Sequence, residues 1–238
     1  MNLIMVAHGT RRPEGVAMIG DIAEQVSGLL QHTVQIAFVD VLGPTPGEAL
    51  SDAAVTRRSA IVVPAFLSRG FHVRTDLPAH VSASGHLDVT VTPALGPSPH
   101  IVRIAAAQIA KIGWRPGDSV VLAAAGTSDP AACNDLRTTA RLLSELTGSP
   151  VRLAFAATGN PSVPAAVANA RSGSRSRVVV ASYLLADGLF QNRLRNCDAD
   201  LVSEPLGKHP GLARLIANRF QQARYRPTCT IPSTSRVA

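Results

Sequence analysis

Three side chains that can bind a metal ion or accept a proton stand where predicted strands end. His8 follows the first apolar run of the chain, Asp40 follows the second, and His72 lies in the loop after the third. Two imidazoles and a carboxylate suit a divalent transition metal whose remaining coordination positions stay open. A neutral imidazole also accepts protons near neutral pH. The chemistry that these residues suggest is metal binding coupled to proton transfer.

The elements that must position these residues alternate between strands and helices. Short apolar runs predict strands, and apolar residues at helical spacing predict amphipathic helices. The predicted strands are 3–7, 34–39, 60–67 and 87–92, and the predicted helices are 13–30, 46–56, a short one after Asp76, and 98–113. This alternation predicts a parallel sheet covered by helices on both faces. If the strand order is 2-1-3, the strand before His8 lies between the other two, and the three side chains converge at one edge.

The pattern then repeats in the second half of the chain. The matching pairs are 3–13 with 120–130, 34–50 with 151–167, and 61–72 with 178–190. The repeat predicts an α/β fold of two tandem similar domains, each a four-stranded parallel sheet flanked by helices, with flavodoxin-like topology. The expected boundaries are 1–115 and 118–225, followed by a flexible tail, 226–238.

The two copies differ at the three polar positions. The matching residues of the second copy are apolar, namely Ala125, Ala157 and Phe190. This contrast favours a single site, which the first copy builds in the cleft between the domains. Taken singly, each polar residue has a structural alternative, because a histidine at a strand end is often a satisfied structural residue and Asp40 could cap a turn.

Composition excludes several other classes of protein. The net charge is +7 and comes almost entirely from arginine, but the arginines are dispersed and aromatics make up 4%, which argues against nucleic-acid binding. Arginine also suits a small substrate with many carboxylates. No apolar run is long enough to span a membrane, and no secretory signal is recognisable, so we expect a cytoplasmic protein. The three cysteines have no C-x-x-C spacing that would indicate a structural zinc site.

Four motifs resemble those of a known family, the sirohydrochlorin chelatases, which are class II tetrapyrrole chelatases. Residues 6–11, V-A-H-G-T-R, resemble the family's first strand end, and residues 37–40, A-F-V-D, resemble its second. The family's P-x-F-L-x-x-G-x-H-x-x-x-D-(I/L)-P segment is matched by residues 64–78. Residues 183–193 resemble the corresponding stretch of its second copy. One departure is aspartate at position 40, where the family usually has glutamate, so direct coordination there is less secure.

The resemblance implies insertion of a divalent metal ion into sirohydrochlorin in sirohaem or cobalamin biosynthesis, with release of two protons. Fe²⁺ is preferred and Co²⁺ is the alternative. His8 and His72 are then the catalytic residues and, with Asp40, the metal ligands. The metal is a substrate, and no tightly bound organic cofactor is expected. The implied partner is the tetrapyrrole alone, without nucleic acid or membrane, bound to a monomer or a homodimer.

The resemblance also implies a set of substrate-binding residues around the cleft. Arginines are expected to pair with substrate carboxylates, small residues to let the backbone approach the ring, and Ala125 with Phe190 to form an apolar wall. The expected residues are Gly9, Thr10, Arg11, Arg69, Gly70, Arg74, Gly126, Thr127, Phe190 and Arg193.

Three other functions remain in competition at this point. A non-catalytic metal carrier or tetrapyrrole-binding protein would use the same ligands. A two-lobed binding protein without metal is a second alternative. A histidine phosphatase is disfavoured, because Ala7 stands where its R-H-G signature requires arginine.

Overall fold

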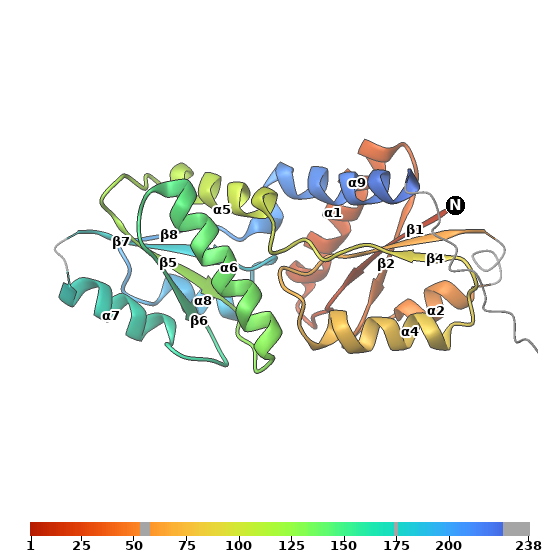
Figure 1. The fold of residues 1–238 in the computed structure, drawn as a ribbon, viewed down its shortest axis with the longest axis horizontal. Coiled ribbons are helices and arrows are strands. Elements are labelled where there is room, and N and C mark those ends of the chain that lie inside the picture. Colours follow the sequence, from red (N-terminus) through yellow and green to blue (C-terminus); the bar gives the residue numbers. More distant parts are fainter. Residues whose placement is uncertain (53–57, 174–175, 226–238) are drawn as a thin grey trace, which may run out of the picture.

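The computed structural model describes residues 1–52, 58–173 and 176–225, which form two parallel sheets side by side along the long axis (Figure 1). The strand order is β2-β1-β3-β4 in one sheet and β6-β5-β7-β8 in the other. The strands of the first sheet are β1 (Asn2–Ala7), β2 (Val34–Phe38), β3 (Ala60–Pro64) and β4 (Val89–Val91). Those of the second are β5 (Ser119–Ala124), β6 (Val151–Phe155), β7 (Val178–Tyr183) and β8 (Leu201–Val202). The predicted tail, 226–238, and the end of the predicted helix 46–56 lie outside the described residues.

Helices lie on both faces of each sheet, as the alternating pattern predicts (Figure 1). Those from the first half of the chain are α1 (Pro13–Leu30), α2 (Pro46–Ser51), α4 (Leu77–Ala83) and α5 (Pro99–Lys111), with a π-helical turn, η1 (His72–Asp76), before α4. Those from the second half are α6 (Pro130–Thr147), α7 (Val163–Gly173), α8 (Leu189–Arg195) and α9 (Pro210–Arg224), with a 3₁₀ turn, η2 (Leu206–Lys208). None of the described helices combines the length and the hydropathy that a membrane span would need.

In the first sheet β1 lies between β2 and β3, and in the second β5 lies between β6 and β7, which confirms the expected 2-1-3 order. Both strands pair in parallel with two neighbours. Residues 3–7 of β1 are buried without alternation, because helices cover this strand from both sides. The carboxyl ends of β1, β2 and β3 therefore meet at one edge, and those of β5, β6 and β7 at the matching edge of the second sheet.

The last helix of each sequence copy packs on the sheet of the other copy. Helix α5 lies against β7 and α6, and α9 lies against β3 and α1 (Figure 1). Each buries an apolar stripe there, such as Ile101 and Ile109 on α5 and Ile216 and Phe220 on α9. One buried apolar cluster consequently joins the two sheets. The packing units thus differ from the units of the sequence repeat, because the helix that completes each sheet comes from the other half.

We name the packing units by these elements. The first lobe is the β2-β1-β3-β4 sheet with α1, α2, α4 and α9, and the second lobe is the β6-β5-β7-β8 sheet with α5, α6, α7 and α8. The carboxyl ends of the strands in the two lobes border a shared cleft.

Candidate active site

The loop after β1 holds His8 in a conformation that requires glycine at the next position. Gly9 has a φ of +96°, and a Cβ atom there would lie 2.0 Å from the backbone oxygen of Asp40. The backbone amide of Asp40 in turn donates to the carbonyl of His8 at 3.0 Å. These contacts between two strand-end loops fix the main chain of His8 at the mouth of the cleft.

The second lobe repeats this backbone arrangement with different side chains. Gly126 has a φ of +133°, and a Cβ atom there would lie 2.3 Å from the backbone oxygen of Thr158. The amide of Ala157 donates to the carbonyl of Ala125 at 2.8 Å, as Asp40 does to His8 in the first lobe. The repeat has therefore conserved the loop geometry, while the polar groups belong to one lobe.

The two predicted histidines lie next to each other. The ring centroids of His8 and His72 are 4.6 Å apart, and the ring planes are nearly perpendicular, at 89°. His8 directly follows β1 and is exposed, whereas His72 begins η1 and is half-buried. Residues that are 64 positions apart in the chain are thus paired at one end of the cleft.

Each imidazole has a hydrogen-bond partner at Nδ1. His8 Nδ1 lies 3.1 Å from the carbonyl oxygen of Gly9, and His72 Nδ1 lies 2.6 Å from Oδ2 of Asp76. A carbonyl and a carboxylate can only accept, so Nδ1 must carry the proton in both rings. In the neutral form, Nε2 of each ring therefore keeps its lone pair for a metal ion or a proton.

Asp40 does not join the histidine pair in this structure. Its carboxylate accepts a hydrogen bond from the amide of Val41 at 2.7 Å, and its side chain is exposed. Within the described part of the chain, no three His, Cys, Asp or Glu side chains are grouped closely enough to hold a metal ion. Of the three expected ligands, only the two histidines lie together in this structure. The carboxylate of Asp40 instead accepts a hydrogen bond within the turn that follows β2. Its role as a third ligand stays a prediction.

The cleft between the lobes has a volume of about 960 Å³ and is lined by loops of both. Of the residues expected to bind substrate, those that line it are Gly9, Thr10, Arg11, Gly70, Gly126, Thr127 and Phe190. The apolar residues Ala125 and Ala157, which match His8 and Asp40 in the repeat, also line the cleft from the second lobe. Arg69, Arg74 and Arg193 do not line the cleft.

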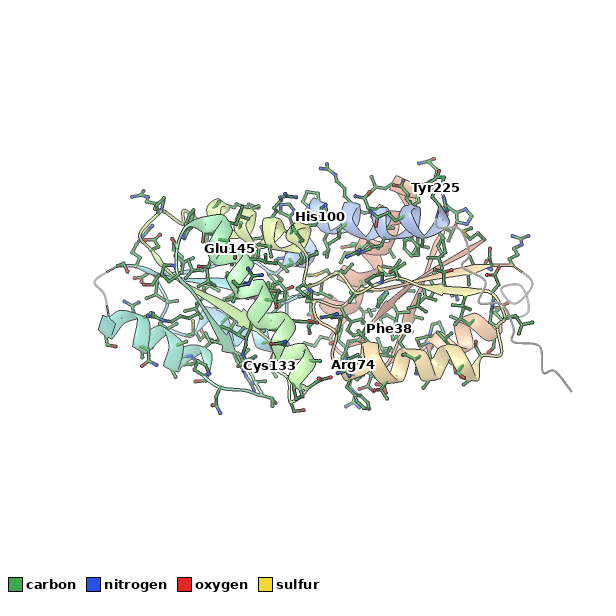
Figure 2. The ribbon with its side chains drawn as sticks, in the orientation of Figure 1. Phe38, Arg74, His100, Cys133, Glu145 and Tyr225 are labelled. Carbon is green, nitrogen blue, oxygen red and sulfur yellow. The ribbon has the colours of Figure 1, made fainter. Side chains whose placement is uncertain are left out.

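These three arginines have partners within the protein. Arg69 forms an ion pair with Asp135. Arg74, which Figure 2 shows where the two lobes meet, lies with Nη1 3.5 Å from Oδ1 of Asp129. Arg193 donates to a backbone carbonyl and lies over the ring of Phe190, 5.7 Å from its centroid. Their guanidinium groups are therefore already engaged, which the sequence could not show.

Arg11 and Arg12 are in a different position. Both line the cleft beside His8, and neither has an ion-pair partner among the residues that the structure describes. They are the arginines best placed to meet the carboxylates of a ligand in the cleft. Arg12 directly follows Arg11 in the sequence, and both belong to the arginines beside the histidine loops, some of which we expect to pair with substrate carboxylates.

The ion pair of Arg69 and Asp135 joins the two lobes, with the carboxylate buried at 3% exposure and the arginine side chain 60% exposed. Burial acts to raise the pKa of Asp135, but the hydrogen bonds from Arg69 outweigh it and hold that pKa below its ordinary value. The same hydrogen bonds raise the pKa of Arg69. Both groups are consequently charged at neutral pH.

Sequence reasoning did not assign Asp76 a role of its own. The signal for it was present, because the spacing His72-x-x-x-Asp76 places the two side chains on one face of a helical turn. Asp135 and Tyr183 gave no comparable signal, since their partners lie far away in the sequence.

The sequence was compared with protein-family models and with curated proteins, and both comparisons match it to one family of chelatases. The family model CbiX matches residues 2–112 and 119–223. The sirohydrochlorin ferrochelatase of Priestia megaterium is 25% identical, and the alignment covers 92% of this chain and 89% of that protein. The sirohydrochlorin cobaltochelatase of Methanothermobacter thermautotrophicus is 33% identical over 92 residues, which are 36% of this chain and 64% of that protein.

Solved structures share the two-sheet architecture. SirB from Bacillus subtilis with Fe³⁺ superposes with a TM-score of 0.80 at 20% identity, covering 94% of this chain and 96% of that one. A cobalt complex of the sirohydrochlorin chelatase SirB from Bacillus subtilis subspecies spizizenii gives 0.75 at 19% identity, covering 94% and 95%. At this level of identity, the likeness establishes the fold.

Proposed function

This chain belongs to the CbiX family, and from that premise we propose that it inserts Fe²⁺ or Co²⁺ into sirohydrochlorin. Relatives named for ferrochelatase and for cobaltochelatase activity both match it. The observation that carries the proposal is the pair of imidazoles, 4.6 Å apart, at the edge of a cleft between two lobes. A cleft of about 960 Å³ is of the size that ligand-binding sites have.

Metal insertion needs lone pairs and bases at one place. Two N–H bonds of the macrocycle break, each nitrogen gives its electron pair to the metal ion, and two protons leave for bases. His8 and His72 suit both tasks, because Nε2 of each neutral ring has a free lone pair. They hold the incoming ion, and as a macrocycle nitrogen replaces each imidazole, its N–H bond breaks, the bond's electron pair goes to the metal ion, and the vacated Nε2 accepts the proton.

Asp76 contacts His72 at Nδ1, the ring nitrogen that does not bind the metal ion in this proposal. Its carboxylate accepts the Nδ1 proton, which fixes the tautomer and the orientation of the ring. A negative charge at this place also stabilises the imidazolium that forms when Nε2 accepts a proton. Asp40, on the turn beside His8, is proposed as a further ligand that reaches the ion after its side chain leaves the amide of Val41.

The cleft fits a flat ring with an anionic edge. Ala125 and Phe190 of the second lobe offer an apolar surface to the face of the ring, and Arg11 and Arg12 offer guanidinium groups to its carboxylates. Gly126 lets the backbone come close to the ring. The second lobe thus supplies binding surface, and the first lobe supplies the reacting groups.

Anaerobic turnover of sirohydrochlorin with each metal tests the proposal. The native protein should metallate many rings per chain, whereas a carrier would yield at most one. His8→Ala and His72→Ala should each abolish insertion. His100→Ala is the matched control, because this histidine is exposed on α5 and does not line the cleft (Figure 2). Native rates in both histidine variants of the cleft would overturn the assignment.

A further inference from the structure

The segment between β3 and η1, residues 65–71, leads directly to His72. Side chains of the second lobe form hydrogen bonds with the main chain of this segment. The carbonyl of Leu67 accepts a hydrogen bond from the hydroxyl of Tyr183, at the end of β7, at 3.0 Å. The amide of Arg69 donates to Oδ2 of Asp135, on α6, at 2.8 Å. Both bonds cross the boundary of the lobes. They join residues 116 and 66 positions apart in the sequence.

Asp135 is built for this contact. Its side chain is 3% exposed, and its two oxygens receive both the main-chain amide and the guanidinium fork of Arg69. Nε of Arg69 lies 3.0 and 3.2 Å from the two oxygens, and Nη2 lies 2.6 Å from Oδ1. A bidentate pair of this kind restricts direction as well as distance. The backbone at Arg69 is therefore held in a defined place relative to α6.

Tyr183 is equally constrained. Its side chain is fully buried, and burial raises the pKa of its phenol, which therefore stays protonated and donates to Leu67. A Cβ atom at Gly96 would lie 2.6 Å from the Tyr183 hydroxyl and 2.2 Å from the carbonyl oxygen of Leu67. The backbone of Gly96 thus lies directly against this hydrogen bond, and a side chain at position 96 would displace it.

The anchored segment continues directly into the turn that presents His72. The carbonyl of Gly70, next to Arg69, accepts hydrogen bonds from the amides of Val73 at 3.0 Å and Arg74 at 3.1 Å. Those bonds start the turn around His72. His8, in contrast, follows β1 and is fixed by contacts within the first lobe. The segment before η1 also has a bond within the first lobe, from the amide of Ala65 to the carbonyl of Val6 at 2.8 Å. The separation of the two imidazoles therefore depends on contacts with both lobes.

We propose that Asp135 and Tyr183 are positioning residues, through which the second lobe sets the place of His72 relative to His8. The second lobe then does more than cover the ring, because its position determines the geometry of the histidine pair. This inference deepens the proposed function. It rests on that function only where it treats His8 and His72 as a metal site.

Nuclear magnetic resonance of the metal-free protein measures the geometry directly. The perpendicular ring of His72 shifts the ring-proton signals of His8 by its ring current, so a displaced His72 changes those signals. Asp135→Asn and Tyr183→Phe should both move them. Glu145→Gln is the matched control on the same helix, since Glu145 pairs with Arg141 at the surface, and it should leave them unchanged.

Binding of Co²⁺ alone supplies the second readout. We expect the dissociation constant to rise about tenfold in Asp135→Asn, as when other residues that orient metal ligands are removed, and to rise less in Tyr183→Phe. Native ring signals and native cobalt affinity in both variants would overturn the proposal. If Asp135→Asn does not fold, Tyr183→Phe decides, because it removes one hydroxyl and keeps the ring. If the native protein binds no Co²⁺, the proposed function fails, and the ring signals still decide the positioning.

Discussion

Replacing Asp76 by asparagine tests how far the orientation of His72 determines metal binding. The carboxylate accepts the Nδ1 proton at 2.6 Å, and asparagine keeps the size and an accepting oxygen but loses the charge. Loss of such a supporting partner weakens metal binding by about 10- to 100-fold, or about 1.4 to 2.8 kcal/mol. The side chains of His72 and Asp76 are 33% and 27% exposed, so solvent screens the interaction and favours the lower end, about tenfold.

The assay is titration of the metal-free protein with Co²⁺, followed by anaerobic turnover of sirohydrochlorin. Asp76→Asn should raise the dissociation constant for Co²⁺ and lower kcat, and leave the KM for sirohydrochlorin nearly unchanged, because the residue does not line the cleft. Asp21→Asn, an exposed substitution on α1, is the control for the change of charge. A cobalt affinity and a kcat within twofold of native values would refute the role given to Asp76.

Three further predictions follow from the same structure. Arg11→Ala should raise the KM for sirohydrochlorin about tenfold with little change in kcat, since one charged hydrogen bond is lost; an unchanged KM in steady-state kinetics would remove this residue from the site. Gly9→Ala should destabilise the fold by at least about 1–2 kcal/mol, because its φ is +96° and the new Cβ atom would meet the backbone oxygen of Asp40; thermal unfolding measures this, and a native melting temperature would contradict it. The pKa of Asp135 is lowered in the folded state, so its contribution is present above the ordinary value of 3.8 and is lost as the pH falls through the lowered value. Asp135→Asn should therefore cost about 1.5–3 kcal/mol of unfolding free energy at neutral pH and progressively less in acid, and denaturant unfolding that shows a pH-independent difference would oppose this.

The sequence was sufficient to predict where β1 ends and which strands lie beside it, whereas the third predicted strand, 60–67, runs only to Pro64. Buried parallel strands appear as uninterrupted apolar runs, so the chain marks where β1 stops and His8 begins. The sequence repeat predicted two parallel sheets of the same kind. The 2-1-3 strand order predicted that His8 and His72 lie at the same edge of the first sheet. These predictions succeed because the apolar runs that mark strands are local in the sequence, and because alternating strands and helices allow few strand orders.

Side-chain partners and helix placement could not be predicted in the same way. The carboxylate of Asp40 prefers its own turn, and Arg69 is neutralised by Asp135, a residue of the other half of the chain. Such choices depend on which groups tertiary packing brings together. The exchange of α5 and α9 between the lobes has the same origin. The apolar face of an amphipathic helix predicts that the helix packs against a sheet, but it does not predict which sheet.

At the strand ends, the two lobes share the backbone of the loops and differ in the side chains that the loops carry. Gly9 and Gly126 build the same close contact between strand-end loops, so the backbone alone does not distinguish the lobes. The distinction lies in single side chains, histidine at position 8 and alanine at position 125. Since α5 and α9 join both sheets into one apolar core, the lobes are held in a fixed relation. The proposed site, with His8 and His72 on the first lobe and the bonds of Asp135 and Tyr183 from the second, depends on that fixed relation.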